Sequence, residues 1–172
     1  MEICYSNKDI SDRCNCIVLT YKDLLDYDDI DSMLGKHKAA VILYEQKENF
    51  GHWCCVFLED GVLYFFDPYG IFPDEQLKDI DDRYRIKSGQ DYHYLSYLMA
   101  ISPYEVDYND YQLQDEHKGI NTCGRWCVAR ILNRDLDANE FAALFEPGDE
   151  KINPDLLVTE YTNSLPFNNN NN

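Results

Sequence analysis

The sequence predicts an α+β domain with a mixed central sheet flanked by helices. Its first half holds three short apolar runs, over residues 40–45, 53–58 and 62–66, that end in turn residues as strands do. Its second half places apolar side chains at helical spacing, most clearly over residues 124–133. Because the three runs are apolar on both faces of a strand, we expect helices to cover the sheet on at least one side.

A tight turn joins the second and third predicted strands. Glu59-Asp60-Gly61 contains the Asp-Gly pair that favours a two-residue hairpin connection. Asp67-Pro68-Tyr69-Gly70 then ends the third strand in another turn. A further short strand is predicted over residues 105–108, at an edge of the sheet.

Caps and helix breakers place the remaining elements. Gly35 favours the end of a helix, and Asp137 with Glu140 forms an Asp-x-x-Glu analogue of the capping box. The predicted helical segments cover residues 20–25, 29–34, 73–80, 92–101 and 137–145.

The composition favours a single folded domain. The chain has 172 residues, 45% of them apolar or aromatic, which suffices for one core and is too few for two domains of ordinary size. We expect the domain to cover residues 1–164. The asparagine-rich residues 165–172 are expected to form a disordered tail.

Charge and cysteine content narrow the partners and the compartment. A net charge of −17 repels phosphate backbones, so we expect no nucleic-acid partner and favour basic or neutral proteins instead. The seven cysteines are an odd number and no signal peptide opens the chain, which indicates a reduced, intracellular protein. No apolar run approaches the roughly 18 residues of a membrane span, so no membrane partner is expected.

The most informative stretch is Asn121-Thr122-Cys123-Gly124-Arg125-Trp126-Cys127, where a polar loop turns into an apolar helix. Thr122 is a candidate N-cap, so Cys123 would lie in the first helical turn, where free N–H groups and the helix dipole favour a thiolate. Gly124 would leave room for an approaching substrate backbone. The alternative is a buried structural cysteine, a common fate of this residue.

His52 and Asp67 supply the other parts of an activated thiol. A ribbon that runs from His52 to Asp67 and turns at residues 59–61 brings its two open ends together. We therefore expect near cross-strand neighbours, joined by a hydrogen bond from the Nδ1–H of His52 to the carboxylate. Asp67 would orient the ring while His52 takes the proton from Cys123.

An acyl-transfer site also needs donors for the oxyanion of the tetrahedral intermediate. The backbone N–H of Cys123 would supply one donor. The second would come from a glutamine side chain upstream, and the sequence offers both Gln112 and Gln114.

Gly51-His52-Trp53, the Phe66-Asp67-Pro68 strand end, a preceding glutamine and Thr122-Cys123-Gly124 together resemble the adenain and Ulp1-like cysteine peptidases. The resemblance spans roughly residues 40–135. It implies the family fold, with Cys123 as nucleophile, His52 as general base and acid, Asp67 as orienting residue and Gln114 as oxyanion donor. Trp53 would roof a channel for small side chains, so that glycine precedes the cut. The spacing from Gln114 to Cys123 is longer than is usual in the family, which keeps Gln112 open.

Within this family the chain looks most like the maturation proteases of large DNA viruses and virophages. The resemblance then implies an endopeptidase that cuts viral capsid or polyprotein precursors in the virion and in the virus factory of the host cytoplasm. It implies a monomer that needs neither a metal nor an organic cofactor.

Three alternatives stay open at this stage. The enzyme could act on ubiquitin or a ubiquitin-like protein, whose Gly-Gly tail fits the same channel, or the chain could be an inactive binding module on the same fold. A zinc site is the third, although no pair of cysteines has Cys-x2-Cys spacing. Its potential ligands are Cys14, Cys16, Cys54, Cys55, His117, Cys123 and Cys127.

Overall fold

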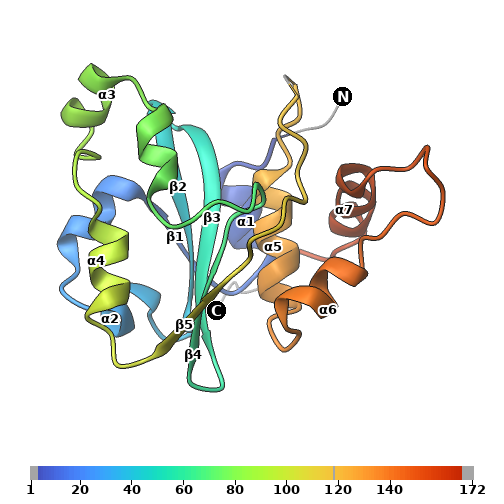
Figure 1. The fold of residues 1–172 in the computed structure, drawn as a ribbon, viewed down its shortest axis with the longest axis horizontal. Helices are drawn as coiled ribbons and strands as arrows, with labels where there is room; N and C mark the ends of the chain where they lie inside the picture. The colour runs from blue at the N-terminus through green and yellow to red at the C-terminus, as the bar shows by residue number, and fades with distance from the viewer. Residues whose placement is uncertain (1–3, 118, 168–172) are drawn as a thin grey trace.

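The computed structural model, which describes residues 4–117 and 119–167, has a five-stranded mixed sheet between two layers of helices (Figure 1). The strands lie in sequence order: β1 (Ile17–Thr20), β2 (Ala39–Lys47), β3 (Phe50–Glu59), β4 (Val62–Phe66) and β5 (Glu105–Tyr108). The two inner contacts, β2 with β3 and β3 with β4, are antiparallel, whereas both edge strands pair in parallel. The predicted α+β class with a mixed sheet is confirmed.

The β3–β4 hairpin forms as the Asp-Gly pair predicts. Glu59 pairs with Val62, and the two residues between them, Asp60 and Gly61, have φ angles of 48° and 79°. Positive φ at both central positions is the geometry that two-residue hairpins favour. At the open end of the hairpin Cys55 pairs with Phe66, so the chain leaves β4 beside the middle of β3.

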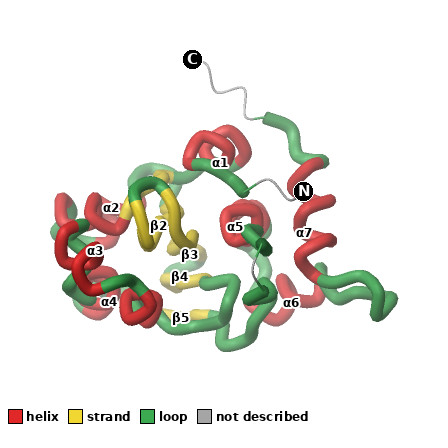
Figure 2. The backbone as a smooth tube through the Cα atoms, turned by 90° about the horizontal axis from the view of Figure 1, so that it is seen from above, coloured by secondary structure: helices red, strands yellow, loops and turns green. Residues whose placement is uncertain are grey.

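Helices cover both faces of the sheet, as Figure 2 shows from above. One layer contains α2, α3 and α4, and the other contains α1, α5, α6 and α7. The helices are α1 (Asn7–Arg13), η1 (Tyr21–Asp26), α2 (Ile30–Leu34), η2 (Glu75–Asp79), α3 (Asp82–Lys87), α4 (Tyr94–Ala100), α5 (Cys123–Leu132), α6 (Ala138–Ala143) and α7 (Pro154–Asn163), where η marks a 3-10 helix.

Two apolar cores result from this layering. Neighbouring residues of β3 contribute to opposite cores: Cys54 packs with the α2 and α4 side, and Cys55 packs with α5. Alternation of side chains along a strand has this effect. Helix α5 lies against β3 and is buried over nearly its whole length, so it is the central helix that the sequence predicts.

Some elements differ from the sequence predictions. The segment predicted as a helix over residues 73–80 is the shorter 3-10 helix η2, preceded by Asp74 in the left-handed conformation with φ of 68°. Helices α1, α3 and α7 were not predicted; α3 has no buried residue and α1 has only Ile10, so neither carries apolar periodicity.

The chain end lies partly within the described region. Leu165, in the predicted disordered tail 165–172, packs against the core that contains α5, while residues 168–172 lie outside the described residues. Among the helices described, none has the length and apolar character needed to cross a bilayer.

Substitution of Gly124 by alanine tests the packing of α5. A Cβ at this position would lie 2.9 Å from the Cβ of Tyr5 and 3.2 Å from Cδ1 of Trp53. We expect Gly124→Ala to lower the free energy of unfolding by about 1–3 kcal/mol through overpacking, despite the higher helix propensity of alanine.

Urea unfolding measures this effect, and Gly148→Ala is the matched control because no atom lies within 4 Å of its added Cβ. Equal stability of the two variants would contradict close packing at Gly124.

Candidate active site

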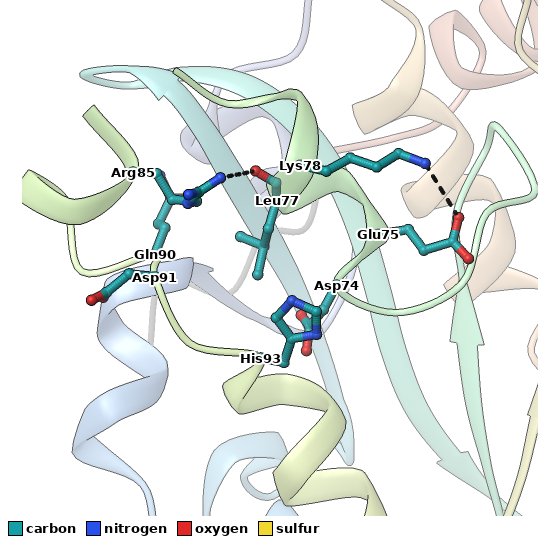
Figure 3. A pocket seen from close by; sticks show the side chains of 8 residues that line it. All are labelled: Asp74, Glu75, Leu77, Lys78, Arg85, Gln90, Asp91 and His93. Atoms are coloured by element: carbon teal, nitrogen blue, oxygen red, sulfur yellow. Dashed lines mark hydrogen bonds and ion pairs between the residues drawn. The ribbon is translucent and has the colours of Figure 1, made fainter. Parts of the chain in front are cut away.

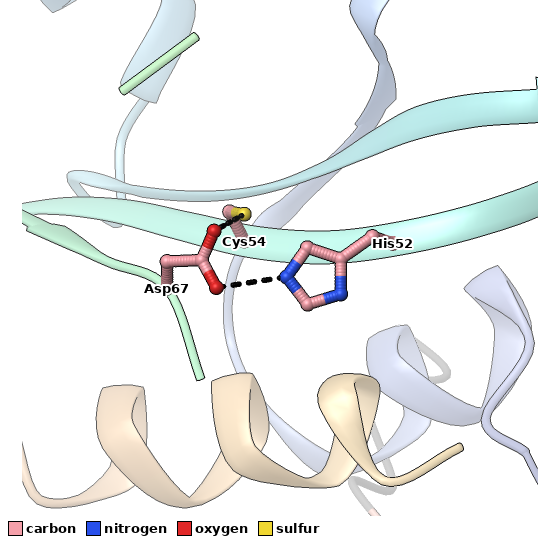
Figure 4. Close-up of side chains that lie close together, drawn as sticks. All are labelled: His52, Cys54 and Asp67. Atoms are coloured by element: carbon pink, nitrogen blue, oxygen red, sulfur yellow. Dashed lines mark hydrogen bonds and ion pairs between the residues drawn. The ribbon is translucent and has the colours of Figure 1, made fainter. Parts of the chain in front are cut away.

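His52 and Asp67 meet at the open end of the hairpin (Figure 4). The distance from Nε2 of His52 to Oδ1 of Asp67 is 2.8 Å, and the two residues are only 4% and 1% exposed. The predicted pairing is confirmed, but the expected ring nitrogen is wrong. Phe66 pairs with Cys55, so the next residue, Asp67, lies beside Cys54 and is displaced along β3 from His52. From this position its carboxylate meets Nε2, the ring nitrogen farther from the backbone. This leaves Nδ1 for another partner.

Groups other than His52 also hold the Asp67 side chain in place. Its Oδ1 also accepts a hydrogen bond from the backbone N–H of Tyr69 at 2.7 Å, and its Oδ2 accepts one from the Cys54 thiol at 3.2 Å. Burial and the charge of Asp67 raise the pKa of the Cys54 thiol well above its usual value, which keeps it protonated as a donor. Both carboxylate oxygens are therefore held in place.

The backbone of Asp67 is held by Asn109. The Asn109 side chain accepts the N–H of Asp67 at 3.0 Å and donates to its carbonyl at 2.6 Å. Asn109 follows the edge strand β5 and is far from Asp67 in the sequence, so no local pattern pointed to it. Cys54 could have been found, because it lies two residues after His52 on the same face of β3.

The electrostatics of the pair favour a protonated imidazole. Burial alone lowers the pKa of His52, but the Asp67 carboxylate and the Cys123 side chain outweigh burial and raise the pKa to about 10. Cys123 lies close enough to His52 to contribute to this rise in its pKa. The structure thus brings together the three residues that the sequence assigned to the triad.

Cys123 is the first residue of α5 and is 4% exposed. In this position its backbone N–H lacks a partner within the helix. Thr122 is the N-cap residue as expected, but its side chain does not cap the helix. The Thr122 hydroxyl instead donates to Oδ1 of Asp155 at 2.5 Å.

Asp155 anchors the start of α5 from a distant part of the chain. This residue of α7 is 1% exposed and also accepts hydrogen bonds from Nε1 of Trp126 and the backbone N–H of Asp115, both at 2.9 Å. Each of the three donors belongs to α5 or to the loop that leads to it. Asp155 was not predicted as a site residue, since nothing in the local sequence of α7 indicates a distant partner.

Tyr69 covers the imidazole. Its ring stacks on that of His52 with the centroids 4.4 Å apart and an interplanar angle of 11°. The Asp67–Gly70 turn places it there, and Gly70 has φ of 72° with its Cα close against the Tyr111 backbone. Burial, followed by the charges of Cys123 and Asp67, raises the pKa of the Tyr69 hydroxyl to about 12, so it stays neutral.

The structure distinguishes the two candidate glutamines. Gln114 is 1% exposed, and its Nε2 lies 3.4 Å from the Tyr69 hydroxyl and 3.3 Å from the Ile120 carbonyl oxygen. Gln112 is exposed and its amide donates to the Gln114 carbonyl. Oε1 of Gln114 is buried without a hydrogen-bond partner in the described part of the chain. Two long hydrogen bonds leave this amide free to reorient.

Trp53 and Gly124 lie beneath the N-terminal segment. Trp53 is 6% exposed, and its Nε1 donates to the Tyr5 carbonyl at 3.2 Å. Tyr5 also fills the space beside Gly124 that was expected for a substrate backbone. A small cavity of about 120 Å³ reaches Trp53 from the side of Asn7 and Asn49.

A separate cavity of about 360 Å³ lies along η2 and the segment around α3 (Figure 3). It contains none of the predicted site residues, and its main polar groups are paired within the fold. Gln90, for example, bonds both backbone groups of Glu45, and Arg85 bonds Asp82 and the Leu77 carbonyl. This cavity therefore offers few free groups to a ligand.

The proposed zinc ligands are not assembled as a set in the described residues. Cys54 and Cys55 face opposite cores, and the His117 side chain is exposed and paired with Asp115. The ligand atoms of His52, Cys54 and Asp67 do lie within 4.8 Å of one another. Their mutual hydrogen bonds account for that proximity.

Comparisons with known proteins address the family. No protein-family model matches the sequence. The central domain of the uncharacterized Lpg1148 protein from Legionella pneumophila has a TM-score of 0.39 and 14% identity, covering 94% of this chain and 98% of that one. The uncharacterized protein V9 of Sputnik virophage is 41% identical over 166 residues, which are 94% of this chain and 95% of V9. This chain therefore belongs to the same family as V9, which supports a virophage origin.

Proposed function

We propose that this protein is a cysteine endopeptidase in which Cys123 is the nucleophile, His52 the general base and acid, and Asp67 the orienting residue. One observation carries the proposal. A buried, hydrogen-bonded His52–Asp67 pair interacts with a thiol at the first position of a buried helix. A nucleophile next to a base, with the base held by an orienting acid, makes up an activated thiol.

The reaction follows from this arrangement. The Cys123 sulfur, its proton taken up by His52, attacks the scissile carbonyl carbon and forms a C–S bond. His52 then gives the proton to the leaving amine as the C–N bond breaks. Water next transfers a proton to His52 and attacks the thioester, which releases the acid and the Cys123 sulfur. No step requires a metal or an organic cofactor.

The oxyanion of each tetrahedral intermediate needs preorganised donors. The backbone N–H of Cys123 is one, since it opens α5. Gln114 is the other, because it is buried beside Tyr69 and its Nε2 forms only long hydrogen bonds, of 3.4 Å and 3.3 Å, that a bond to the oxyanion can replace. Stabilisation by such donors is commonly the largest catalytic contribution.

The substrate is a viral capsid or polyprotein precursor, cut after a small residue such as glycine during virion maturation. The virophage relative supports the viral setting. The preference for glycine rests on the resemblance to the adenain and Ulp1-like peptidases, because Tyr5 occupies the space beside Gly124. An acidic chain also suits a protein substrate better than a nucleic acid.

The first test replaces the nucleophile. Wild-type protein and Cys123→Ala are incubated with a virion capsid precursor and with a ubiquitin-like fusion, and cuts are mapped by mass spectrometry. We expect wild type to cut the capsid precursor after glycine and Cys123→Ala to be inactive but folded, because Cys123 is the proposed nucleophile that forms the thioester.

Cys16→Ala is the control, since it removes a thiol outside the site, and should retain activity. Cutting of the fusion alone would replace the maturation protease by a ubiquitin-like-protein peptidase. Comparable turnover by Cys123→Ala would contradict the mechanism, and cutting of neither substrate would favour an inactive binding module.

The second test separates the glutamines. We expect Gln114→Ala to lower kcat about 10²- to 10³-fold through loss of an oxyanion donor, as such losses do elsewhere. Gln112→Ala should change kcat little because the Gln112 side chain is exposed. The reverse order in steady-state kinetics would assign the oxyanion hole to Gln112.

The third prediction concerns protonation of His52. Its pKa of about 10 lies above the usual 6.5, so the stability that the charged ring contributes is fully present below about pH 6.5 and is lost as pH rises through about 10. In Asp67→Asn, burial should dominate and lower the pKa of His52 towards or below 6.5.

Nuclear magnetic resonance of the ring nitrogens during a pH titration measures this pKa in both proteins. Unfolding curves at several pH values should show the largest stability difference between wild type and His52→Gln at acidic to neutral pH. An unchanged pKa of His52 in Asp67→Asn would rule out the carboxylate as the source of the shift.

A further inference from the structure

Another cavity, also about 360 Å³ in volume, lies near the proposed catalytic pair, although neither residue of the pair lines it. Tyr69 forms one of its walls, and the ring of Tyr69 stacks on His52. A group held in this cavity is therefore separated from the imidazole by a single aromatic ring. The location makes the cavity a candidate subsite for a substrate side chain.

The cavity contains a polar side chain without a partner among the described residues. Gln76 of η2 is 6% exposed and lines the cavity, yet its side-chain amide forms no hydrogen bond with any residue that the structure describes. Its amide atoms are not fully enclosed by the described residues, so they face the open space of the cavity. In the cavity along α3, by contrast, the amide of Gln90 is fully paired. Gln76 is thus available to a ligand.

The charge of the cavity wall selects the ligand. Asp79 and Glu116 contribute two carboxylates, against one ammonium group from Lys78. Lys78 is exposed, and its Nζ lies 4.0 Å from Oε2 of Glu75, a residue that does not line the cavity. The charge of Glu116 also reaches the Tyr69 hydroxyl, where it contributes to the raised pKa of that group. The whole chain, at −17, adds to the negative potential.

We propose that this cavity binds a long cationic side chain of the substrate, a lysine or an arginine close to the scissile bond. The aliphatic stem would lie along Ile71 and the ring of Tyr69, and the cationic end would reach Asp79, Glu116 and the Gln76 amide oxygen. The inference rests on the proposed peptidase activity and adds a basic residue to its substrate.

Peptide profiling tests the specificity. Wild type, Cys123→Ala and the double variant Asp79→Asn/Glu116→Gln are incubated with a diverse peptide mixture, and cuts are mapped by mass spectrometry. Wild-type cuts should show lysine or arginine at one fixed position near the cut. Two fluorogenic peptides that differ only in arginine or citrulline at that position should differ at least tenfold in kcat/KM, and the double variant should reduce the difference to less than twofold.

Asp149→Asn/Glu150→Gln is the matched control, because it removes the same two charges at an exposed loop between α6 and α7 and should keep the preference. Cutting that depends on Cys123 but ignores basic residues would overturn the pocket and leave the peptidase standing. Absence of any Cys123-dependent cut would overturn the peptidase and, with it, a substrate pocket.

A binding measurement gives a readout independent of turnover. N-acetyl-arginine methylamide is titrated into Cys123→Ala protein while the side-chain amide resonance of Gln76 is followed, with the citrulline analogue as reference. We expect a saturable shift with the arginine compound only, abolished in Asp79→Asn/Glu116→Gln. Equal shifts with both compounds, or none with either, would contradict recognition of a cation.

Discussion

The buried ion pair between His52 and Asp67 is the interaction on which the site depends. Removing two charges from water costs several kcal/mol per ion, and their attraction compensates only when the remaining hydrogen-bonding positions are also filled. Here the Tyr69 N–H and the Cys54 thiol donate hydrogen bonds to the Asp67 carboxylate, while Asn109 holds the backbone of Asp67. The turn after β4 and the segment after β5 are therefore fixed by the need to bury this pair.

A second buried carboxylate, that of Asp155, fixes the position of the helix that carries the nucleophile. Asp155 holds Thr122, Trp126 and the loop at Asp115, so helix α7 determines where α5 begins. The imidazole belongs to the sheet and the thiol to a helix, and each side has its own acidic anchor. Relative placement of base and nucleophile then depends on the packing of α5 against β3 in one of the two cores.

The surroundings of the nucleophile are shaped by residues far away in sequence. Tyr5 packs over Gly124 and Trp53 and lies against the guanidinium of Arg125, 4.4 Å from its ring centroid. The N-terminal segment thereby limits the space beside Cys123 on this side. Tyr69 limits it on the side of the imidazole, and the cavity that contains Gln76 lies next to that ring.

Elements with local causes could be predicted from the sequence. Strand alternation, the Asp60-Gly61 turn and the helix after Thr122 depend on near neighbours, and counting along the hairpin was enough to bring His52 to Asp67. The packing of the whole domain fixes which ring nitrogen meets the acid, which glutamine is buried, and that Asn109 and Asp155 anchor the site. Those features depend on contacts between segments separated by many residues, and their geometry is fixed only when both cores are packed.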